Sequence, residues 1–484
     1  MPKTVRTLDE CRLLFLNWRD PGHPLAGGAE IYCMEIAQRL AIRGAKITLF
    51  SAKYPNAADR EVSNSIEIRR AGGTYSLYLY ALIHVLKNRK KYDAIVDFQN
   101  GIPFFSPLVT PSAVVLTMFH VHQEQFKIHF KWPLNQIGKI AEGPFTRQVY
   151  RHIPIVAISA TTRQNIRTQL KLDEPIFIIP CGTDATKATI KSIKERTAYP
   201  TIVCVTRLVP HKQIDILLGT LQLLKNRYHN LKLHIVGDGP LRERLEGTAK
   251  QLEISDIVTF YGKVSEGTKD KLVSSSWLAA NPSNAEGWSL TVMEAALSGV
   301  PTVAFDVPGL RDSIIDGKTG WLVKETGTKR TDAVTGLANA IDDALQKLKD
   351  PLTAKVWGER CHKWARQFTW ENSATKFGQV IIAEINRKKL GIKERRKVAD
   401  NATVVTFSSP NPDATVLQLE NFVRSTDSWA RDTNRFSLFL YSCDDTEAYG
   451  VLRRLGPVHD ITTRPAHIVD LLLGAKMSET KSPT

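Results

Sequence analysis

Two glutamates eight positions apart are the residues of this sequence best placed to do chemistry. Glu286 precedes a Gly-Trp-Ser turn at residues 287–289, and Glu294 falls about two turns into the helix predicted after it. Gly287 lets backbone amides approach a ligand closely, and the N-terminus of the following helix favours a phosphate. This arrangement suits a nucleoside diphosphate that carries a sugar, with the ribose near Glu294 and the sugar near Glu286.

The alternative interpretation is that both glutamates are solvated helix charges, which is the usual state of an isolated pair. The neighbouring residues argue against it, because an apolar helix is buried and two carboxylates on a buried helix need a reason to be there. These apolar neighbours are Leu290, Val292, Met293, Ala295, Ala296 and Leu297.

Two cations, Arg207 and Lys212, flank a turn made by Pro210 at the end of another apolar run. Both can reach one anionic point at the carboxyl end of a strand. There they would stabilise the charge that develops on the terminal phosphate of a departing nucleoside diphosphate. An arginine five residues before a lysine is usually surface charge, but together with the Glu286 segment it predicts a donor half-site.

The elements that must position these residues follow an α/β pattern. Apolar runs of four to seven residues alternate with stretches at helical spacing, which is typical of parallel sheets with crossover helices. A first series of strands is predicted at residues 12–17, 46–51, 94–98, 113–119, 155–158 and 176–179. A second series is predicted at residues 201–206, 232–236, 258–261, 277–280, 302–305 and 320–323. Two such halves imply a cleft at their junction, outside the carboxyl ends of the strands.

Local signals refine this plan. A helix is predicted over residues 29–43, with Gly44 as its left-handed cap, and Ser159 is the predicted N-cap of the helix before Leu170. The polar stretch after residue 184 is interpreted as a linker. Residues 403–475 are predicted to form a small β-α-β-α segment. The expected domains are residues 1–184, a linker at 185–199, residues 200–365, a helix at 366–386 that crosses back to the first domain, a basic linker at 387–402, the segment at 403–475 and a disordered tail at 476–484.

Composition bounds the function. The 484 residues are 43% hydrophobic and 24% charged, which fits a folded globular protein, and no window approaches ~18 uninterrupted apolar residues. The N-terminus is interpreted as a first strand and not as a signal peptide. The six scattered cysteines fit a reducing cytoplasm and no zinc site. The net charge of +16 is densest at residues 87–91 and 387–397, which without interleaved aromatic residues indicates an anionic membrane surface or solvated runs and no nucleic-acid partner.

Taken together, these motifs resemble those of the retaining glycosyltransferases of family 4, which have the GT-B fold of two facing Rossmann-like domains. The resemblance covers roughly residues 11–385 and is specific because its pieces occur in the right order. Those pieces are Gly27-Gly28-Ala29-Glu30 after the first strand, Arg207 with Lys212, Gly237-Asp238-Gly239-Pro240, and Glu286 with Glu294.

The resemblance implies roles for these residues. Arg207 and Lys212 would hold the donor diphosphate, Glu294 the ribose and Glu286 the transferred sugar, while the Gly27–Gly28 loop closes over the phosphates from the first domain. It also implies retention of configuration and no required metal or cofactor. The predicted donor-binding set is completed by Gly237, Gly287, Trp288, Ser289 and Leu290, where Ser289 replaces the glycine of many relatives.

The resemblance also implies a histidine close to the anomeric centre, after the fourth strand of the first domain. His120 is the predicted catalytic histidine, with a strand-capping role as the alternative. His122 and Glu124 complete a His-x-His-x-Glu pattern, but it lacks supporting ligands and no metal site is predicted. Residues 97–103 resemble a cleft loop that touches the acceptor, and an Asn-Gly turn is an equally good interpretation.

The predicted function is therefore transfer of a hexosyl group from a nucleotide-diphospho-sugar to a glycan or lipid-linked acceptor. A role in cell-envelope polysaccharide or glycolipid synthesis, in the cytoplasm with peripheral contact to the membrane, rests on the basic surface and on analogy. One alternative is a nucleotide-sugar epimerase of the same fold, which would turn over donor without an acceptor. Another is a non-catalytic scaffold that binds sugar nucleotides.

Overall fold

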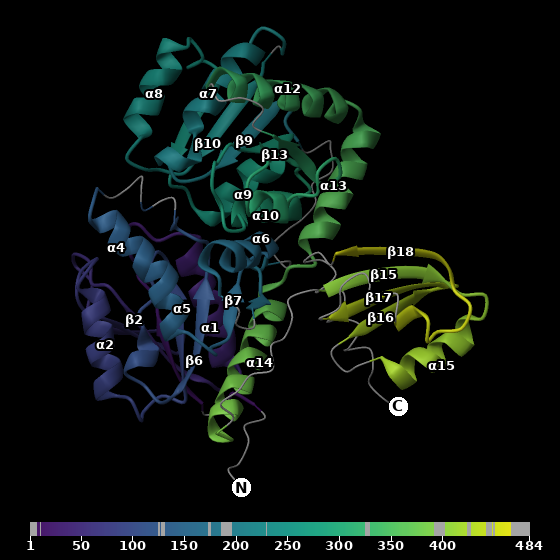
Figure 1. The fold of residues 1–484 in the computed structure, drawn as a ribbon. Helices are drawn as coiled ribbons and strands as arrows, with labels where there is room; N and C mark the ends of the chain where they lie inside the picture. The colour runs from purple at the N-terminus through teal and green to yellow at the C-terminus, as the bar shows by residue number, and fades with distance from the viewer. Residues whose placement is uncertain are drawn as a thin grey trace.

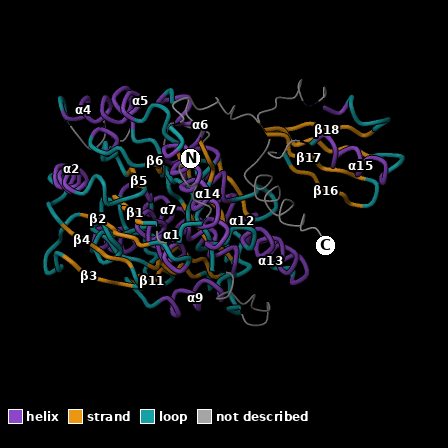
Figure 2. Tube along the Cα trace, turned by 90° about the horizontal axis from the view of Figure 1, so that it is seen from below, coloured by secondary structure: helices purple, strands orange, loops and turns teal. Residues whose placement is uncertain are grey.

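The structure is a computed structural model. It describes residues 7–9, 11–123, 126, 131–172, 176–184, 196–228, 230–324, 330–391, 402–423, 427–441, 448 and 451–465. The described residues form three units, each built on its own sheet. Two α/β units are stacked on each other, and the smaller third unit stands to one side of them (Figures 1 and 2).

The sheet of the first unit has the order β3-β4-β2-β1-β5-β6-β7-β8. Neighbouring strands are parallel except for the antiparallel pair β3 and β4. Every strand predicted in this half is confirmed to within one residue at its ends, while β3 and β4 were not predicted. The strands are β1 Arg12–Leu16, β2 Lys46–Ser51, β3 Arg60–Ser63, β4 Ile66–Arg70, β5 Ala94–Gln99, β6 Ala113–Met118, β7 Ile155–Ala157 and β8 Ile176–Ile178.

Helices cover this sheet, and two predicted caps are confirmed. Gly44, with φ 91°, follows the end of α1, and the Ser159 hydroxyl accepts a hydrogen bond from the Thr162 amide (3.1 Å) at the start of α6. The helices are α1 Gly28–Ile42, α2 Leu77–Lys87, the 3-10 turn η1 Ser106–Leu108, α4 Leu134–Ile140, the π-helix η2 Ala141–Phe145, α5 Thr146–Val149, α6 Ala160–Asn165 and the π-helix η3 Ile166–Leu170.

The second unit has a parallel sheet of order β11-β10-β9-β12-β13-β14. Its predicted strands are likewise confirmed to within one residue. They are β9 Thr201–Val205, β10 Lys232–Val236, β11 Val258–Gly262, β12 Leu278–Asn281, β13 Thr302–Phe305 and β14 Gly320–Val323. The helices are η5 Pro210–Lys212, α7 Ile214–Leu224, α8 Arg242–Gln251, α9 Glu266–Ser275, α10 Leu290–Leu297, α11 Leu310–Ser313 and α12 Arg330–Leu348.

Both sheets reverse their strand order at one point, which lies between β1 and β5 in the first and between β9 and β12 in the second. The loops that leave the carboxyl ends of strands diverge at such a point and open a crevice for ligands. The segments that carry the predicted site residues leave β1, β9 and β12, so this topology places them at the two crevices.

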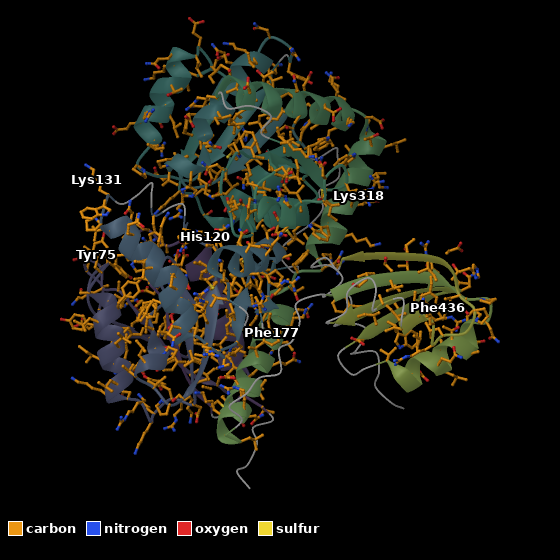
Figure 3. All side chains as sticks on the ribbon, in the orientation of Figure 1. Tyr75, His120, Lys131, Phe177, Lys318 and Phe436 are labelled. Carbon is orange, nitrogen blue, oxygen red and sulfur yellow. The ribbon has the colours of Figure 1, made fainter. Side chains whose placement is uncertain are left out.

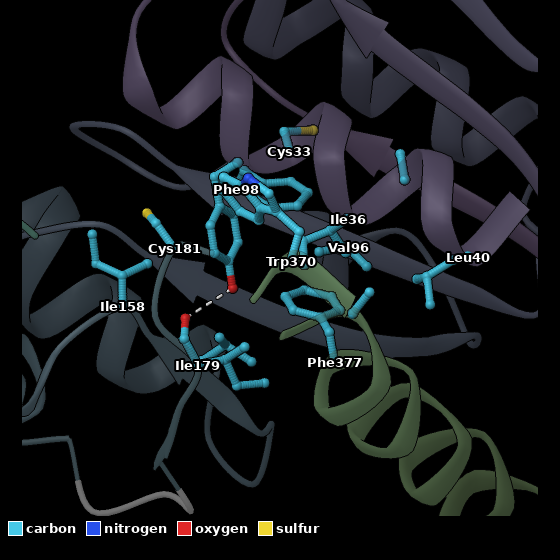
Figure 4. Close-up of a cluster of buried hydrophobic side chains, with 14 of the residues drawn as sticks. Cys33, Ile36, Leu40, Val96, Phe98, Ile158, Ile179, Cys181, Trp370 and Phe377 are labelled. Atoms are coloured by element: carbon cyan, nitrogen blue, oxygen red, sulfur yellow. Dashed lines mark hydrogen bonds between the residues drawn. The ribbon is translucent and has the colours of Figure 1, made fainter. Parts of the chain in front are cut away.

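The chain returns from the second unit to the first through α13 Pro351–Ala365 and α14 Trp370–Lys389. The helix predicted over 366–386 begins only at Trp370, because the Thr369 hydroxyl caps it by accepting from the Asn372 amide (3.2 Å). α14 packs against α1 and β6. Figure 4 shows Trp370 and Phe377 inside the core of the first unit, where the Tyr32 hydroxyl donates to the Ile179 carbonyl (3.0 Å).

The third unit corrects the prediction of a β-α-β-α segment. Its sheet is antiparallel, in the order β16-β17-β15-β18, and two of its strands were not predicted. With helical residues at 448 and 451–452 before the last strand, it has the β-α-β-β-α-β order of a ferredoxin-like unit. Its elements are β15 Ala402–Ser408, α15 Pro412–Phe422, β16 Ser428–Asp432, β17 Arg435–Tyr441 and β18 His459–Pro465.

The domain boundaries stay predictions. Most of the predicted linkers, at 185–195 and 392–401, and the tail at 476–484 lie outside the described residues. Within the described residues, no helix combines the length and the apolar character that crossing a bilayer requires.

Candidate active site

The predicted site residues of the first and second units meet at the junction between these units, where Figure 3 labels His120. A Cβ on Gly287 would lie 2.6 Å from the Phe119 carbonyl oxygen at the end of β6, so only glycine permits this approach. A Cβ on Gly28 would lie 3.8 Å from Leu290 Cδ1 at the start of α10. The glycine loop of the first unit therefore faces the helix that carries Glu294.

Lys212 and Glu286 form a hydrogen-bonded ion pair, and both side chains are largely buried. The Ser283 hydroxyl also donates to Glu286 Oε1 (3.1 Å). Burial alone would raise the pKa of Glu286, but the charge and hydrogen bond of Lys212, together with Ser283, lower it below its ordinary value. The Asn284 amide donates to the His211 carbonyl (3.0 Å), which fastens the two loops together. The carboxylate is therefore ionised and held in place.

A polar network supports this pair from below, and the sequence did not reveal it. The Ser283 hydroxyl donates to Asn281 Oδ1 (2.6 Å), and Asn281 Nδ2 donates to Ser289 Oγ (3.0 Å). Ser289 has φ 80°, a left-handed conformation that favours glycine. The backbone geometry at this position would suit glycine, and the bond from Asn281 shows what the serine hydroxyl adds.

Glu294 is paired with Lys269 of α9 (Oε2 to Nζ, 3.1 Å), a residue that the sequence analysis did not single out. Burial raises the pKa of Glu294, and the charge of Lys269 only partly offsets this effect. The two predicted carboxylates thus each have a lysine partner. A ribose bound by Glu294 would have to share that carboxylate with Lys269.

Two predicted donor contacts are qualified by the structure. Gly237 follows β10 with φ 129°, and a Cβ there would overlap the Thr206 carbonyl oxygen, so its place in the turn requires glycine. The Trp288 ring is 1% exposed and packs against Phe368 with centroids 5.0 Å apart. The Trp288 side chain therefore belongs to the core and does not face the cleft, so only its backbone could bind a donor.

His120 is half-buried, and its ring centroid lies 3.8 Å from that of His122. The burial of His211, reinforced by the charge of Lys212, lowers the pKa of His211 to about 4, and His120 contributes to this shift from across the junction. His120 is thus close enough to the loop of the second unit to affect the pKa of His211, and its catalytic role stays a prediction. Glu124 of the His-x-His-x-Glu pattern lies outside the described residues.

Behind His120 lies Glu142, a fully buried carboxyl group in the π-helix η2 that the sequence analysis missed. Glu142 Oε1 accepts from the His122 amide (2.7 Å), and Oε2 accepts from Gln123 Nε2 (2.8 Å). Burial raises the pKa of Glu142 to about 7, although these hydrogen bonds oppose the shift. Only the unusual burial of the side chain identifies it, and the sequence around it gave no such signal.

The candidate acceptor loop at residues 97–103 contains a structural carboxylate. Asp97 is fully buried and accepts hydrogen bonds from the Phe104 amide (2.9 Å) and the Ser106 hydroxyl (3.1 Å). Gly101 has φ 106° between the bridged residues Asn100 and Ile102, so the chain turns there, and contact of this loop with an acceptor stays a prediction. Among the described residues, no group of three or more His, Cys, Asp or Glu side chains could hold a metal ion.

Models of two protein families match adjoining parts of the chain. The model for Glycosyltransferase Family 4 matches residues 26–187, and the model for Glycosyl transferases group 1 matches residues 186–361. The glycine loop, the Glu286 segment and most of the two Rossmann-like units lie within these two ranges, while β1 and α14 lie outside them.

Curated relatives and a solved structure agree with these matches. The chain is 28% identical over 262 residues to a GDP-mannose-dependent alpha-(1-6)-phosphatidylinositol monomannoside mannosyltransferase of Mycobacterium tuberculosis, covering 49% of this chain and 65%, or just under two thirds, of that enzyme. It is 22% identical to a human protein that forms part of phosphatidylinositol N-acetylglucosaminyltransferase, covering 74% of this chain and 73% of the human protein. Sucrose-phosphate synthase from Thermosynechococcus elongatus shares the GT-B fold, with a TM-score of 0.63 at 21% identity over 76% of this chain and 98% of that one.

Proposed function

We propose, from the premise that the chain belongs to the glycosyltransferases of family 4 and group 1, that it moves a hexosyl group from a nucleotide-diphospho-sugar with retention of configuration and without a metal ion. The observation that carries this proposal is the meeting of Arg207, the Lys212–Glu286 pair and the Gly27 loop at one junction.

The chemistry follows from these charges. Arg207 and Lys212 would bind the diphosphate and stabilise the negative charge that develops on it as the glycosidic bond breaks. Glu286, ionised beside Lys212, would orient the transferred sugar, and Glu294 would hold the ribose. His120 would approach the sugar from the first unit. Cations supplied by side chains take the part that a metal ion plays in other transferases, so no metal is required.

The acceptor that we propose is lipid-linked, in glycolipid or cell-envelope synthesis. The names of the mycobacterial and human relatives both describe glycosyl transfer that involves phosphatidylinositol. The first unit of this chain also has a surface suited to lipid. α2 and α4 lie on the same side of that unit in both views (Figures 1 and 2).

This surface, which we call the α2–α4 surface, consists of large apolar side chains exposed next to basic ones. Its members are Tyr75, Leu79, Tyr80, Ile83, Leu86, Trp132, Leu134, Ile137 and Ile140, and exposure reaches 77% at Tyr75 and 80% at Trp132. Exposed basic residues near them are Lys87, Arg89, Lys90 and Lys131. Apolar side chains beside cations are typical of proteins that bind anionic membrane surfaces.

We propose that this contact is peripheral and on the cytoplasmic face of the membrane. The described cysteines, Cys11, Cys33, Cys181, Cys204 and Cys361, are free and buried, which fits a reducing compartment.

The test is a panel of UDP-, GDP- and ADP-sugars with membrane extracts as the source of acceptor, measuring release of the nucleoside diphosphate. Lys212→Ala and Glu286→Ala should each lower the rate by at least about 100-fold, as expected when a group that stabilises the transition state is removed. EDTA should leave the wild-type rate unchanged, and the anomeric configuration of the product should match that of the donor.

Lys347→Ala is the matched control, because Lys347 forms an exposed ion pair with Asp343 on the same unit. Activity that survives both site substitutions contradicts the site assignment. Donor that is converted without any acceptor would indicate an epimerase instead. Donor that binds but is recovered intact with every acceptor would indicate a scaffold.

A further inference from the structure

Arg19 lies in the loop after β1 and points at the same carbonyl group as Arg207. Arg19 Nη1 donates to the Leu25 carbonyl oxygen (2.9 Å), and Arg207 Nη1 donates to the same oxygen from the second unit (3.3 Å). A Cβ on Gly27 would lie 3.4 Å from Arg207 Cζ. Two guanidinium groups from different units therefore converge beside the glycine loop.

The orientation of Arg19 is fixed by its neighbours. Its Cζ atom lies 3.7 Å from the centroid of the Trp18 ring. Asn17 holds the turn, because its Oδ1 accepts from the Trp18 amide (3.0 Å) and its Nδ2 donates to the Arg19 carbonyl (3.0 Å). A guanidinium stacked on an aromatic ring keeps its N–H groups in one plane and ready for a ligand.

Two carboxylates that follow Arg19 in the sequence bind other partners. Asp20 binds the buried Arg70 through both oxygens (2.8 and 3.1 Å). Glu30 Oε2 accepts from the Gly27 amide (2.7 Å). Among the described residues, neither Arg19 nor Arg207 forms an ion pair with a carboxylate.

The two arginines both keep their positive charge although they lie close together. Burial lowers the pKa of Arg19. The negative charge of Glu30 opposes this shift, and the positive charge of Arg207 adds to it. An arginine in a protein nevertheless stays protonated at neutral pH. Two like charges are thus held together next to backbone amides at the start of α1, an arrangement that an anion would stabilise.

We propose that Arg19 and Arg207 form an interdomain phosphate clamp, in which Arg19 is a phosphate-binding residue supplied by the first unit. This proposal rests on the proposed function, which assigns phosphate binding to Arg207 but nothing to Arg19. Each guanidinium has five N–H donors and uses one on Leu25, so donors remain for the oxygens of a phosphate group. A phosphate bound between them links the two units and stabilises their closed arrangement.

The phosphate has two chemical sources, the diphosphate of the donor and a phosphate group on the acceptor. Titration calorimetry of the full chain with UDP and with GDP tests the first source. Arg19→Met removes the charge at similar length and should weaken the binding of the nucleoside diphosphate by about 10-fold to 100-fold, the range for a lost charge-assisted hydrogen bond. Arg19→Lys keeps the charge but loses the planar guanidinium stacked on Trp18, so it should restore only part of the affinity.

Arg12→Met is the matched control, because Arg12 is the exposed first residue of β1, at the end of that strand opposite the loop that holds Arg19. It should bind UDP and GDP as the wild type does. If Arg19→Met leaves this binding unchanged but raises the KM for an acceptor that bears a phosphate, and not for the same acceptor without it, the clamp holds the acceptor phosphate.

The clamp is overturned if Arg19→Met changes neither quantity, or if Arg19→Lys is as weak as Arg19→Met, since Arg19 would then only shape the loop. Inorganic pyrophosphate separates this outcome from failure of the proposed function. If the wild-type chain binds pyrophosphate but neither UDP nor GDP, and Arg19→Met binds pyrophosphate more weakly, the proposed function is contradicted and the clamp is kept.

Discussion

At the scale of single residues, the site combines charges that are paired with charges that are not. Lys212 neutralises Glu286 and Lys269 neutralises Glu294, while Arg19 and Arg207 share only a carbonyl group. A dianionic diphosphate that enters this junction meets two arginines that are not paired with a carboxylate in the described part of the chain. No ion pair has to break before these arginines bind it. The paired lysines would instead set the positions of the carboxylates that contact the sugar and the ribose.

Glu142 allows a prediction about pH. An unfolded glutamate loses its proton near pH 4.5, whereas burial raises the pKa of Glu142 in the folded chain to about 7. Between these values the folded state binds more protons than the unfolded state, so the contribution of Glu142 to stability falls as the pH rises. Glu142→Gln removes this loss. The free energy of unfolding of Glu142→Gln, minus that of the wild type, should therefore increase between pH 4.5 and pH 7, by up to about 3 kcal/mol.

Urea unfolding at a series of pH values measures this difference, in which the titration of groups that do not interact with Glu142 cancels. Arg12→Met serves again as the control and should differ from the wild type by a constant amount. A difference between Glu142→Gln and the wild type that stays flat over this pH range would contradict the buried, protonated carboxyl group.

Residue types identified the cations and carboxylates of the site, but their partners could not be predicted. Arg207, Lys212, Glu286 and Glu294 stand out because charged residues follow apolar runs. Lys269 pairs with Glu294 only because α9 packs beside α10, a contact between segments that no local pattern encodes. Arg19 and Glu142 were missed for the same reason, and the burial of the Trp288 ring could not be predicted, because a turn residue can point into the core.

At the scale of elements, burial decided what could be predicted. β5 and β6 are buried along their full lengths and appear in the sequence as mostly apolar runs. β3 is an edge strand with mostly exposed residues, and β16 and β18 are the edge strands of the third sheet, so their sequences lack that signal. The prediction missed the antiparallel order of the third unit because it lacked these two strands.

The helix α6 supports a prediction about capping. Ser159 is fully buried, and its hydroxyl accepts from the Thr162 amide at the start of α6. Ser159→Ala leaves that amide without its partner and should lower the free energy of unfolding by about 1 kcal/mol. Urea unfolding measures the loss. The exposed cap Ser265→Ala on α9 is the control, because it loses an equivalent bond to the Thr268 amide (3.2 Å) without burial.

A loss for Ser159→Ala clearly below about 0.5 kcal/mol would show that the cap contributes little to α6. A larger loss than for Ser265→Ala is expected, because a buried amide that has lost its partner cannot bind water instead. The comparison therefore separates the effect of the cap from the effect of its burial.

At the scale of the whole molecule, one continuous core joins the two α/β units. Met293 and Leu297 of α10 pack in the same cluster as Phe119 and Ile158 of the first unit, and α14 completes that cluster. The third unit has its own core, built around Phe407 and Phe436. The junction that holds the candidate site is thus packed from both sides, while the third unit stands apart from it.

The α2–α4 surface gives the last prediction. Leu79 and Ile83 lie one turn apart on α2 and are exposed, so Leu79→Ser with Ile83→Ser removes apolar contact without disturbing the core. Binding to vesicles of equal parts phosphatidylglycerol and phosphatidylcholine, measured by co-sedimentation, should weaken by at least about 10-fold, since each apolar side chain contributes about 1.5–3 kcal/mol when fully buried. Leu417→Ser, which changes an equally exposed leucine on α15, should bind as the wild type does.

Binding of the wild type should also weaken with added salt and with vesicles of phosphatidylcholine alone, because the basic residues act through screened charge. Unchanged binding of the double variant would place the membrane contact elsewhere while leaving donor turnover, and with it the proposed transfer, unaffected.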